Sequence, residues 1–274
     1  MLSTFIIALR EGLEASLIVG ILVAYLSKTG RLHLRRALWS GVVLAIAVSL
    51  ALGAILSFTS RELPAHGEEI FAGVLAVLAV ALVTWMVFWM KRTARNLRHE
   101  LENKVDQAVH IGTFAIATTA FVAVAREGLE TSLFLYTNFK TVKTSMAPSI
   151  GLVLGLTAAI GLGFLIYQRT ISVDLGKFFK ITGVALIIVA AGVLANGVGD
   201  LQSASWLPGG GANAWSVDKW LAPNSLPASI LAGSVGFSTT TTWLQVGVWT
   251  IYLAATLSGY LSSAKKVPFS ATHE

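Results

Sequence analysis

The chain has 274 residues, of which 55% are hydrophobic and only 12% are charged, and its formal net charge is +6. A soluble protein of this length carries roughly 25% charged residues, so the composition excludes an ordinary globular enzyme and a disordered chain. The basic residues lie between apolar runs long enough to cross a bilayer, which indicates membrane topology rather than binding of nucleic acid. The chain has no cysteine, which excludes disulfides and thiolate metal sites.

Seven apolar segments predict seven transmembrane helices in a single all-α transmembrane domain. In chain order the segments cover residues 2–26, 38–58, 70–90, 111–137, 150–167, 181–198 and 244–261. One connection is long, residues 199–243, and it is rich in glycine, serine, tryptophan and threonine. We expect it to be external and assign it no chemical role, although residues 238–242 can begin the last helix.

The basic residues predict the orientation of the helices. Fourteen of them follow the first, third, fifth and seventh segments, whereas four lie on the opposite side of the membrane. Because basic loops stay in the cytoplasm, the N-terminus is predicted outside and the C-terminus in the cytoplasm. Trp85 and Trp89 directly precede Lys91 and fit lipid anchors at the cytoplasmic interface.

The motif Arg-Glu-Gly-Leu-Glu occurs twice, at residues 10–14 and again at residues 126–130. The copies lie in the first and fourth segments, so three crossings separate them and the second copy runs in the opposite direction. This predicts an inverted repeat, in which helices one to three (about residues 1–100) correspond to helices four to six (about residues 110–200), and a seventh helix follows. Such repeats place a substrate site at their interface, near the middle of the membrane.

The motif places six ionisable side chains deep inside apolar segments. Each costs about 2.5 to 3.5 kcal/mol near the bilayer centre, and the helical period puts the three of each copy on one face. If each arginine pairs with one carboxylate, a formal charge of −2 remains, which a cation, protonation of glutamates or a water-filled cavity can compensate. The alternative is that these residues only lock the first helix to the fourth. The residues are Arg10, Glu11, Glu14, Arg126, Glu127 and Glu130.

The available ligands predict the kind of cation. Carboxylate oxygens are hard ligands, and the five histidines lie in loops or at a helix margin, so a hard divalent or trivalent ion fits better than copper(I) or zinc. Spacing alone does not separate iron from manganese, magnesium or calcium. Four further residues before the third helix can concentrate cations at the external mouth: Glu62, His66, Glu68 and Glu69.

The doubled motif, together with the run of residues 82–90 that ends the third segment, resembles the iron permease family of fungal oxidase-coupled and bacterial EfeU-type permeases. The resemblance covers essentially the whole chain. It implies a multi-pass iron importer of the plasma membrane, the inner membrane in bacteria, that carries iron as substrate, in the Fe³⁺ state that carboxylates favour, without a prosthetic cofactor or enzymatic activity. It also implies iron ligands at Glu11, Glu14, Glu127 and Glu130, with Arg10 and Arg126 as charge partners.

The resemblance further implies partner proteins: a periplasmic iron-binding protein and a haem peroxidase in bacteria, or a multicopper ferroxidase in fungi. Relatives often carry the pattern Glu-Leu-Phe-Glu-Gly before the third helix, where this chain has Glu69 followed by Ala72 in place of the second acid, which weakens an accessory site. Three alternatives stay open. They are a transporter or exchanger of another hard cation or of protons, an intramembrane enzyme that uses paired glutamates or Mg²⁺, and a scaffold without a substrate.

Overall fold

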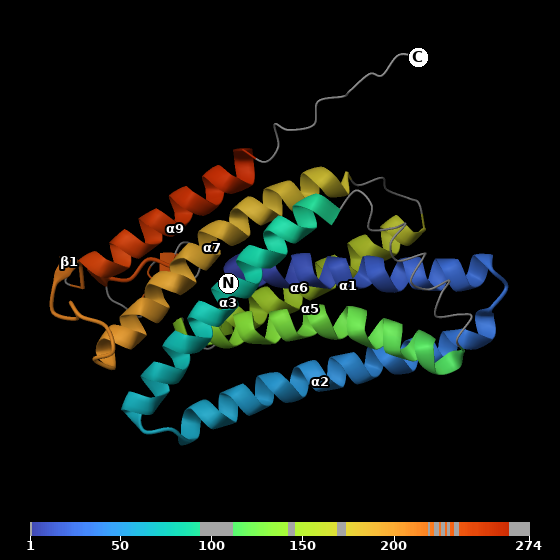
Figure 1. Cartoon of the computed structure of the whole chain (residues 1–274), viewed down its shortest axis with the longest axis horizontal. Coiled ribbons are helices and arrows are strands. Elements are labelled where there is room, and N and C mark those ends of the chain that lie inside the picture. Colours follow the sequence, from blue (N-terminus) through green and yellow to red (C-terminus); the bar gives the residue numbers. More distant parts are fainter. Residues whose placement is uncertain are drawn as a thin grey trace, which may run out of the picture.

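The computed structural model of the chain describes residues 2–93, 112–141, 146–168, 174–218, 220–221, 225, 228, 231–232 and 236–262. Within these residues it contains seven α-helices of at least 20 residues, one short 3-10 helix and two strands (Figure 1). In chain order they are α1 (Leu2–Lys28), η1 (Leu32–Leu34), α2 (Arg35–Glu62), α3 (Ala65–Thr93), α5 (Thr113–Thr141), α6 (Met146–Tyr167), α7 (Leu175–Ser203), β1 (Asn213–Ser216), β2 (Thr240–Thr242) and α9 (Trp243–Ser262).

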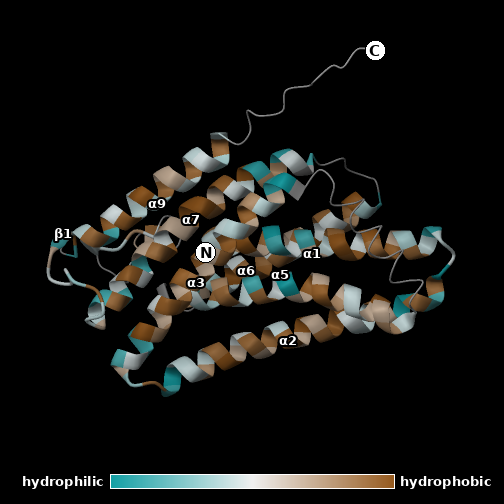
Figure 2. Ribbon diagram, in the orientation of Figure 1, coloured by the Kyte–Doolittle hydropathy of each residue, from teal (hydrophilic) through white to brown (hydrophobic). Residues whose placement is uncertain are grey.

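Each of the seven predicted segments coincides with one of these helices, apart from residue 111, which lies outside the described residues. Five helices are long and apolar enough to cross a membrane, namely α2, α3, α6, α7 and α9. The other two long helices in the described part of the chain, α1 and α5, hold the charged motif copies, and Figure 2 shows hydrophilic residues near the middle of α5 where α2 is hydrophobic along its length. The structure therefore has the helices of a multi-pass membrane protein, and a sevenfold crossing stays a prediction.

The helices associate in a regular set of pairs. The most extensive contacts join α1 to α6, α2 to α5 and α3 to α7, while α9 lies along α7 and α1 contacts α5 in the centre (Figure 1). In the predicted repeat, α1 corresponds to α5, α2 to α6 and α3 to α7. When each helix is exchanged with its counterpart, the α1–α6 pair becomes the α5–α2 pair. The α3–α7 and α1–α5 pairs remain the same pairs. The most extensive contacts are thus the same before and after the exchange, whereas weaker ones, such as α2 with α3 and α5 with α7, have no counterpart of similar extent.

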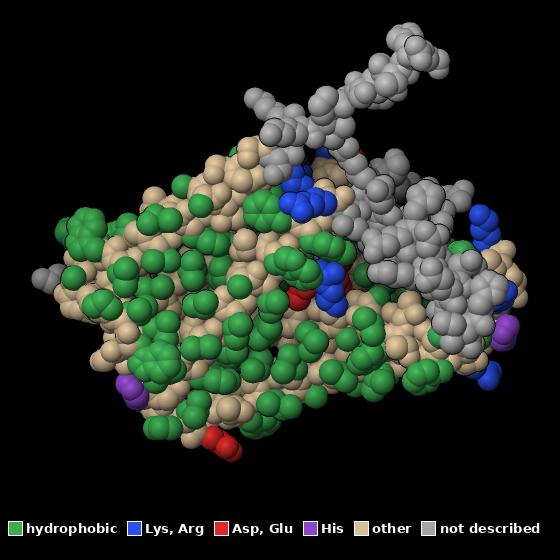
Figure 3. All heavy atoms as spheres, in the orientation of Figure 1, with side chains coloured by type: hydrophobic (Ala, Val, Ile, Leu, Met, Phe, Trp, Pro, Cys, Tyr) green, Lys and Arg blue, Asp and Glu red, His purple; other side chains and the backbone are tan. Residues whose placement is uncertain are grey.

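The bundle has two chemically different ends. The first, which we call the loop end, holds the start of α1, where Ser3 donates a hydrogen bond to Asn138 near the end of α5 (2.9 Å), and it also holds β1 and β2. The opposite end, which we call the basic end, collects Lys and Arg side chains. Figure 3 shows some of them at the right edge of a face on which hydrophobic side chains are widespread. The basic residues described there are Lys28, Arg31, Arg35, Arg36, Lys91, Arg92, Lys177 and Lys180.

The predicted orientation would put this basic end in the cytoplasm, and the orientation stays a prediction. Several residues that carried that prediction lie outside the described residues. They are Arg95, Arg98, Lys104, Lys143, Arg169, Lys219, Lys265 and Lys266.

The long connection contains a small antiparallel sheet, which the all-α prediction did not include. Strands β1 and β2 pair through Asn213 with Thr242 and Ser216 with Thr240. The hydroxyl groups of Thr239 and Thr240 lower the pKa of the Asp218 carboxyl in the same loop, and Thr240 donates to it at 2.7 Å. The carboxylate therefore ties the two sides of the sheet together.

The expectation that residues 238–242 begin the last helix is wrong, because the threonines of β2 favour extended backbone. Helix α9 begins at Trp243 instead. The backbone N–H of Thr242 donates to the side-chain carbonyl oxygen of Gln245 at 2.8 Å, and the backbone N–H of Gln245 donates to the Thr242 hydroxyl at 3.3 Å. This reciprocal pair is a capping box, which fixes the start of a helix.

Small residues let the paired helices approach closely. Where α1 crosses α6, a Cβ atom built on Gly12 would lie 2.8 Å from the Cβ of Ala159. Where α2 crosses α5, a Cβ atom on Gly41 would overlap the carbonyl oxygen of Ala117, a backbone atom that cannot rotate aside. Glycine at these crossings therefore sets the distance between the helices, as is common in membrane bundles.

We expect Gly41→Ala to destabilise the protein, since the added methyl group forces α2 away from α5 and overpacking typically costs about 1 to 3 kcal/mol. Gly161→Ala in α6 is the matched control, because nothing lies within 4 Å of a Cβ atom there. Thermal unfolding in detergent measures both. Equal melting temperatures for the two variants would contradict the close crossing of α2 and α5.

Candidate functional site

The two motif copies meet where α1 and α5 run side by side in opposite directions. Five of the six ionisable side chains are almost fully buried: Arg10 is 1% exposed, and Glu11, Glu14, Glu127 and Glu130 are 2 to 7% exposed. The sixth, the side chain of Arg126, is 29% exposed. The structure therefore places the predicted metal ligands inside the bundle rather than towards the acyl chains.

Three of the four glutamates come together across the helix boundary. One carboxylate oxygen each from Glu11, Glu14 and Glu127 lies within 4.8 Å of the other two. Two of these residues come from α1 and one from α5, so the cluster exists only when the helices pack. Glu130 is not part of this group of three, and its carboxylate pairs with Arg126 at 3.2 Å.

The ion pairs of the motif lie within single helices. Arg10 contacts Glu14 at 3.2 Å and Glu11 at 3.6 Å, all on α1. On α5, Arg126 donates to Glu130 at 3.2 Å. The alternative in which arginine and glutamate only lock α1 to α5 requires ion pairs between the two helices. The three ion pairs described here each lie within one helix, so they do not join α1 to α5.

The carboxyl groups that face each other between the helices are poorly satisfied. Glu11 and Glu127 approach each other across the boundary, with a carboxylate oxygen of each within 4.8 Å, and two carboxyl groups this close favour a proton or a cation between them. The Oε2 atoms of Glu11, Glu127 and Glu130 have no hydrogen-bond partner among the described residues. Because buried polar atoms are normally paired, these unpaired oxygens indicate a position at which a water or a ligand can lie.

The two arginines differ in their surroundings. Arg10 is enclosed by carboxylates, whereas the guanidinium of Arg126 lies over the rings of Trp89 and Trp85, 4.2 and 5.2 Å from their centroids. The two indoles stack on each other with centroids 6.5 Å apart. Their predicted role as lipid anchors is therefore incomplete, because they also supply a cation–π surface for a charge of the motif.

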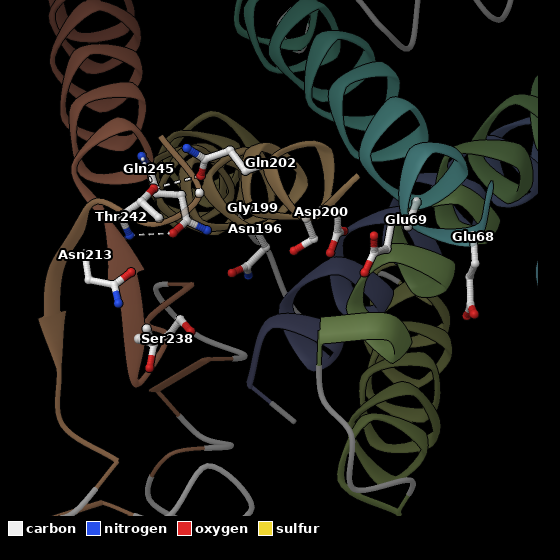
Figure 4. A pocket seen from close by; sticks show the side chains of 14 residues that line it. Glu68, Glu69, Asn196, Gly199, Asp200, Gln202, Asn213, Ser238, Thr242 and Gln245 are labelled. Carbon is white, nitrogen blue, oxygen red and sulfur yellow. Dashed lines mark hydrogen bonds between the residues drawn. The ribbon is translucent and has the colours of Figure 1, made fainter. Parts of the chain in front are cut away.

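A second polar site lies at the loop end. A cavity of about 630 Å³ opens between the start of α3, the end of α7 and the start of α9. Figure 4 shows Glu69 and Asp200 close together on one side of this cavity, with Gln202, Thr242 and Gln245 on the other. Its polar lining comprises the acids Glu68, Glu69 and Asp200 and the amides Asn196, Gln202, Asn213 and Gln245, among other residues.

The cavity includes only part of the predicted external mouth. Glu68 and Glu69 line it, whereas Glu62 and His66 are exposed and are not among its lining residues. Ala72, which replaces the second acid of the related pattern, also lines it. Asp200 is not among the residues predicted for the external mouth, and only the pairing of α3 with α7 brings it next to Glu69.

Apolar helices around a buried set of acidic and basic side chains are features of membrane transport proteins, and comparison with known proteins identifies the family. The model described as "Iron permease FTR1 family" matches residues 1–263. The chain is 38% identical over 264 residues to the ferrous iron permease EfeU of Escherichia coli O6:H1 (strain CFT073), covering 95% of both chains. It is 37% identical over 260 residues to the protein of that name from Yersinia pestis, covering 94% of this chain and 92% of the relative.

The chain belongs to the iron permease FTR1 family, which confirms the resemblance noted from the doubled motif. No solved structure matches it.

Proposed function

We propose that this protein carries iron across the membrane through the cluster formed by Glu11, Glu14, Glu127 and Glu130. The observation that supports this most directly is the meeting of three buried carboxylates from two antiparallel helices within 4.8 Å. Hard oxygen ligands suit iron, and relatives that share about 38% of the sequence are named iron permeases. Arg10 and Arg126 act as charge partners that hold the carboxylates apart between ions.

Charge balance bears on the oxidation state. Four carboxylates and two guanidinium groups sum to −2, so Fe²⁺ brings the cluster to neutrality, whereas Fe³⁺ leaves +1 and calls for a further anion such as hydroxide. Net charge inside a low-dielectric region is costly. The expectation of Fe³⁺ stays a prediction, while this balance and the name of the relatives, ferrous iron permease, make Fe²⁺ the ion to test first.

The arrangement of helices supports transport by alternating access. The most extensive helix contacts are unchanged when α1–α3 are exchanged with α5–α7, as expected of an inverted repeat whose halves rock around a shared site. We propose that the loop end faces the periplasm or cell exterior, because the basic residues gather at the opposite end. In a bacterium this places the protein in the inner membrane.

The loop end is also where partner proteins that deliver iron would dock. The acidic cavity that contains Glu69 and Asp200 opens there, and acidic side chains concentrate cations locally. We propose that periplasmic or extracellular iron-binding or iron-oxidising proteins release iron to this surface.

The test is iron uptake by purified protein in liposomes that enclose a fluorescent iron chelator. Fe²⁺ kept reduced with ascorbate and Fe³⁺ held as citrate are supplied in parallel, and Mn²⁺ and Mg²⁺ are added as competitors. We expect uptake of iron that excess Mg²⁺ does not suppress. The proposal would be overturned if liposomes with protein took up neither form of iron faster than protein-free liposomes. Preferential uptake of Mn²⁺ would assign the cluster to another hard cation.

A further inference from the structure

The contact between α1 and α5 is polar on one side of the glutamate cluster and apolar on the other. Towards the loop end, four polar side chains are buried: Ser3 and Thr4 on α1 are 0% exposed, and Thr137 and Asn138 on α5 are 5% and 3% exposed. Towards the basic end, the corresponding buried residues are all apolar, namely Ile18, Leu22, Ile116 and Ala120.

Helical periodicity puts both sets on the faces that carry the motif. Thr4 precedes Glu11 by seven residues and Ile18 follows it by seven, which is about two helical turns in each direction. On α5, Ala120 precedes Glu127 by seven residues, and Asn138 follows it by eleven, about three turns. The two sets are therefore layers above and below the same cluster, each roughly 10 Å or more from it along the helix axes.

The polar layer is incompletely satisfied. Ser3 donates to Asn138 across the α1–α5 boundary at 2.9 Å, but the Thr4 hydroxyl oxygen is buried without a hydrogen-bond partner among the described residues. A buried hydroxyl in this condition normally has a water or an ion beside it. An apolar layer has no such need, and small hydrophobic constrictions exclude water and hydrated ions.

The polar layer lies beside a connection to the loop-end cavity. Tyr136, next to Thr137 on α5, has its hydroxyl beside that of Ser60 on α2 and within electrostatic range of Asp200. Asp200 lines the cavity, and Figure 4 shows it next to Glu69. Ser60 and Tyr136 are themselves buried, at 1% and 8% exposure. Polar groups thus extend from the cavity to Tyr136, the chain neighbour of Thr137 in the polar layer.

The difference between the layers is a difference between the two halves of the chain. The 116-residue offset of the motif copies relates Thr4 to Ala120 and Leu22 to Asn138. A carrier with two equivalent halves would have the same lining on both sides of its site. Thr4 and Asn138 of the loop-end layer therefore correspond to the apolar Ala120 and Leu22 of the basic-end layer, whereas Ser3 corresponds to Thr119 and Thr137 to Ile21. The asymmetry is specific to the positions of Thr4 and Asn138.

We propose that Ser3, Thr4, Thr137 and Asn138 form the hydrated passage through which a cation reaches the glutamates from the loop end, and that Ile18, Leu22, Ile116 and Ala120 form the barrier that closes the basic end. This rests on the proposed transport of iron, which it deepens by assigning a route and a gate. The hydroxyl and amide oxygens of the polar layer replace part of the hydration shell as the ion approaches the carboxylates.

The chain contains no cysteine, so single cysteines report accessibility without further engineering. Thr4→Cys places one thiol in the polar layer, and Leu22→Cys places one thiol in the apolar layer. Ala79→Cys is the control for non-specific reaction, because Ala79 lies in α3, outside the motif, and is 0% exposed. A membrane-impermeant cationic methanethiosulfonate is added from outside to intact cells. We expect Thr4→Cys to react at least about tenfold faster than Leu22→Cys, which lies behind the apolar barrier, and Fe²⁺ to slow that reaction.

Three results would overturn the proposed passage. They are equal labelling rates at the two positions, a faster rate at Leu22→Cys, and a rate at Thr4→Cys no higher than that at Ala79→Cys. Ser3→Cys repeats the measurement if Thr4→Cys does not reach the membrane. The labelling needs no transport, so its outcome is separate from that of the proposed function. If the protein does not carry iron, Thr4→Cys still reacts and only the protection by Fe²⁺ is lost, whereas iron uptake without labelling rejects the passage alone.

Discussion

Glu14→Gln is expected to lower iron uptake into liposomes by more than about 100-fold while leaving the protein folded. The change keeps the shape of a side chain that joins Glu11 and Glu127 in the buried cluster but removes a charged ligand. Even groups that only support a metal ligand cost about 10- to 100-fold in metal affinity when they are changed, so loss of a ligand should cost more. Initial rates at several iron concentrations separate weaker binding from slower transport.

The matched control for this prediction is Glu62→Gln. It makes the same chemical change at an exposed position that does not line the loop-end cavity. Its uptake should equal that of the unaltered protein. Normal uptake by Glu14→Gln would remove the glutamate cluster from the transport path, whatever the outcome for the control.

Arg10→Met is expected to destabilise the protein far more than Arg126→Met. Arg10 is 1% exposed and pairs with two carboxylates, so its removal leaves buried negative charge uncompensated, which typically costs about 3 to 5 kcal/mol. Arg126 is partly exposed, pairs with one carboxylate and rests on two indole rings. Its loss should cost only about 1 kcal/mol.

Melting temperatures in detergent give the comparison, and a second change supplies the internal check. Glu14→Gln added to Arg10→Met removes one of the unbalanced carboxylates, so the double variant should melt at a higher temperature than Arg10→Met alone. Similar melting temperatures for the two arginine variants would mean that the deeper burial of Arg10 does not make it more important for stability than Arg126.

The sequence predicts the helices well, because an apolar run of about twenty residues has few alternatives in a bilayer. It also predicts that the motif glutamates share a face, since helical period alone decides this, and the approach of Glu127 to Glu11 and Glu14 agrees with that expectation. The strand at residues 240–242 was missed, although Thr242 and Gln245 form a capping box that marks the start of α9.

Other features of the site depend on which helices pack together, and no local pattern encodes them. The contact of Arg126 with Trp89 requires α3 to lie against α5. The proximity of Asp200 to Glu69 requires α7 to lie against α3. Likewise, sequence spacing allowed Arg10 to pair with a glutamate of either motif copy, and only the structure shows that it pairs within its own helix.

That each arginine bonds within its own helix has a consequence for how the two halves of the bundle hold together. Among the described residues no ion pair of a motif arginine joins α1 to α5. Arg10 attracts Glu127 across the boundary, but the carboxyl groups of Glu11, Glu14 and Glu127 also approach one another there and repel one another when ionised. A cation or a proton shared by these carboxyl groups would therefore stabilise the contact between the two helices. On the proposed transport of iron, release of the ion would weaken this contact until a proton or a new ion is bound.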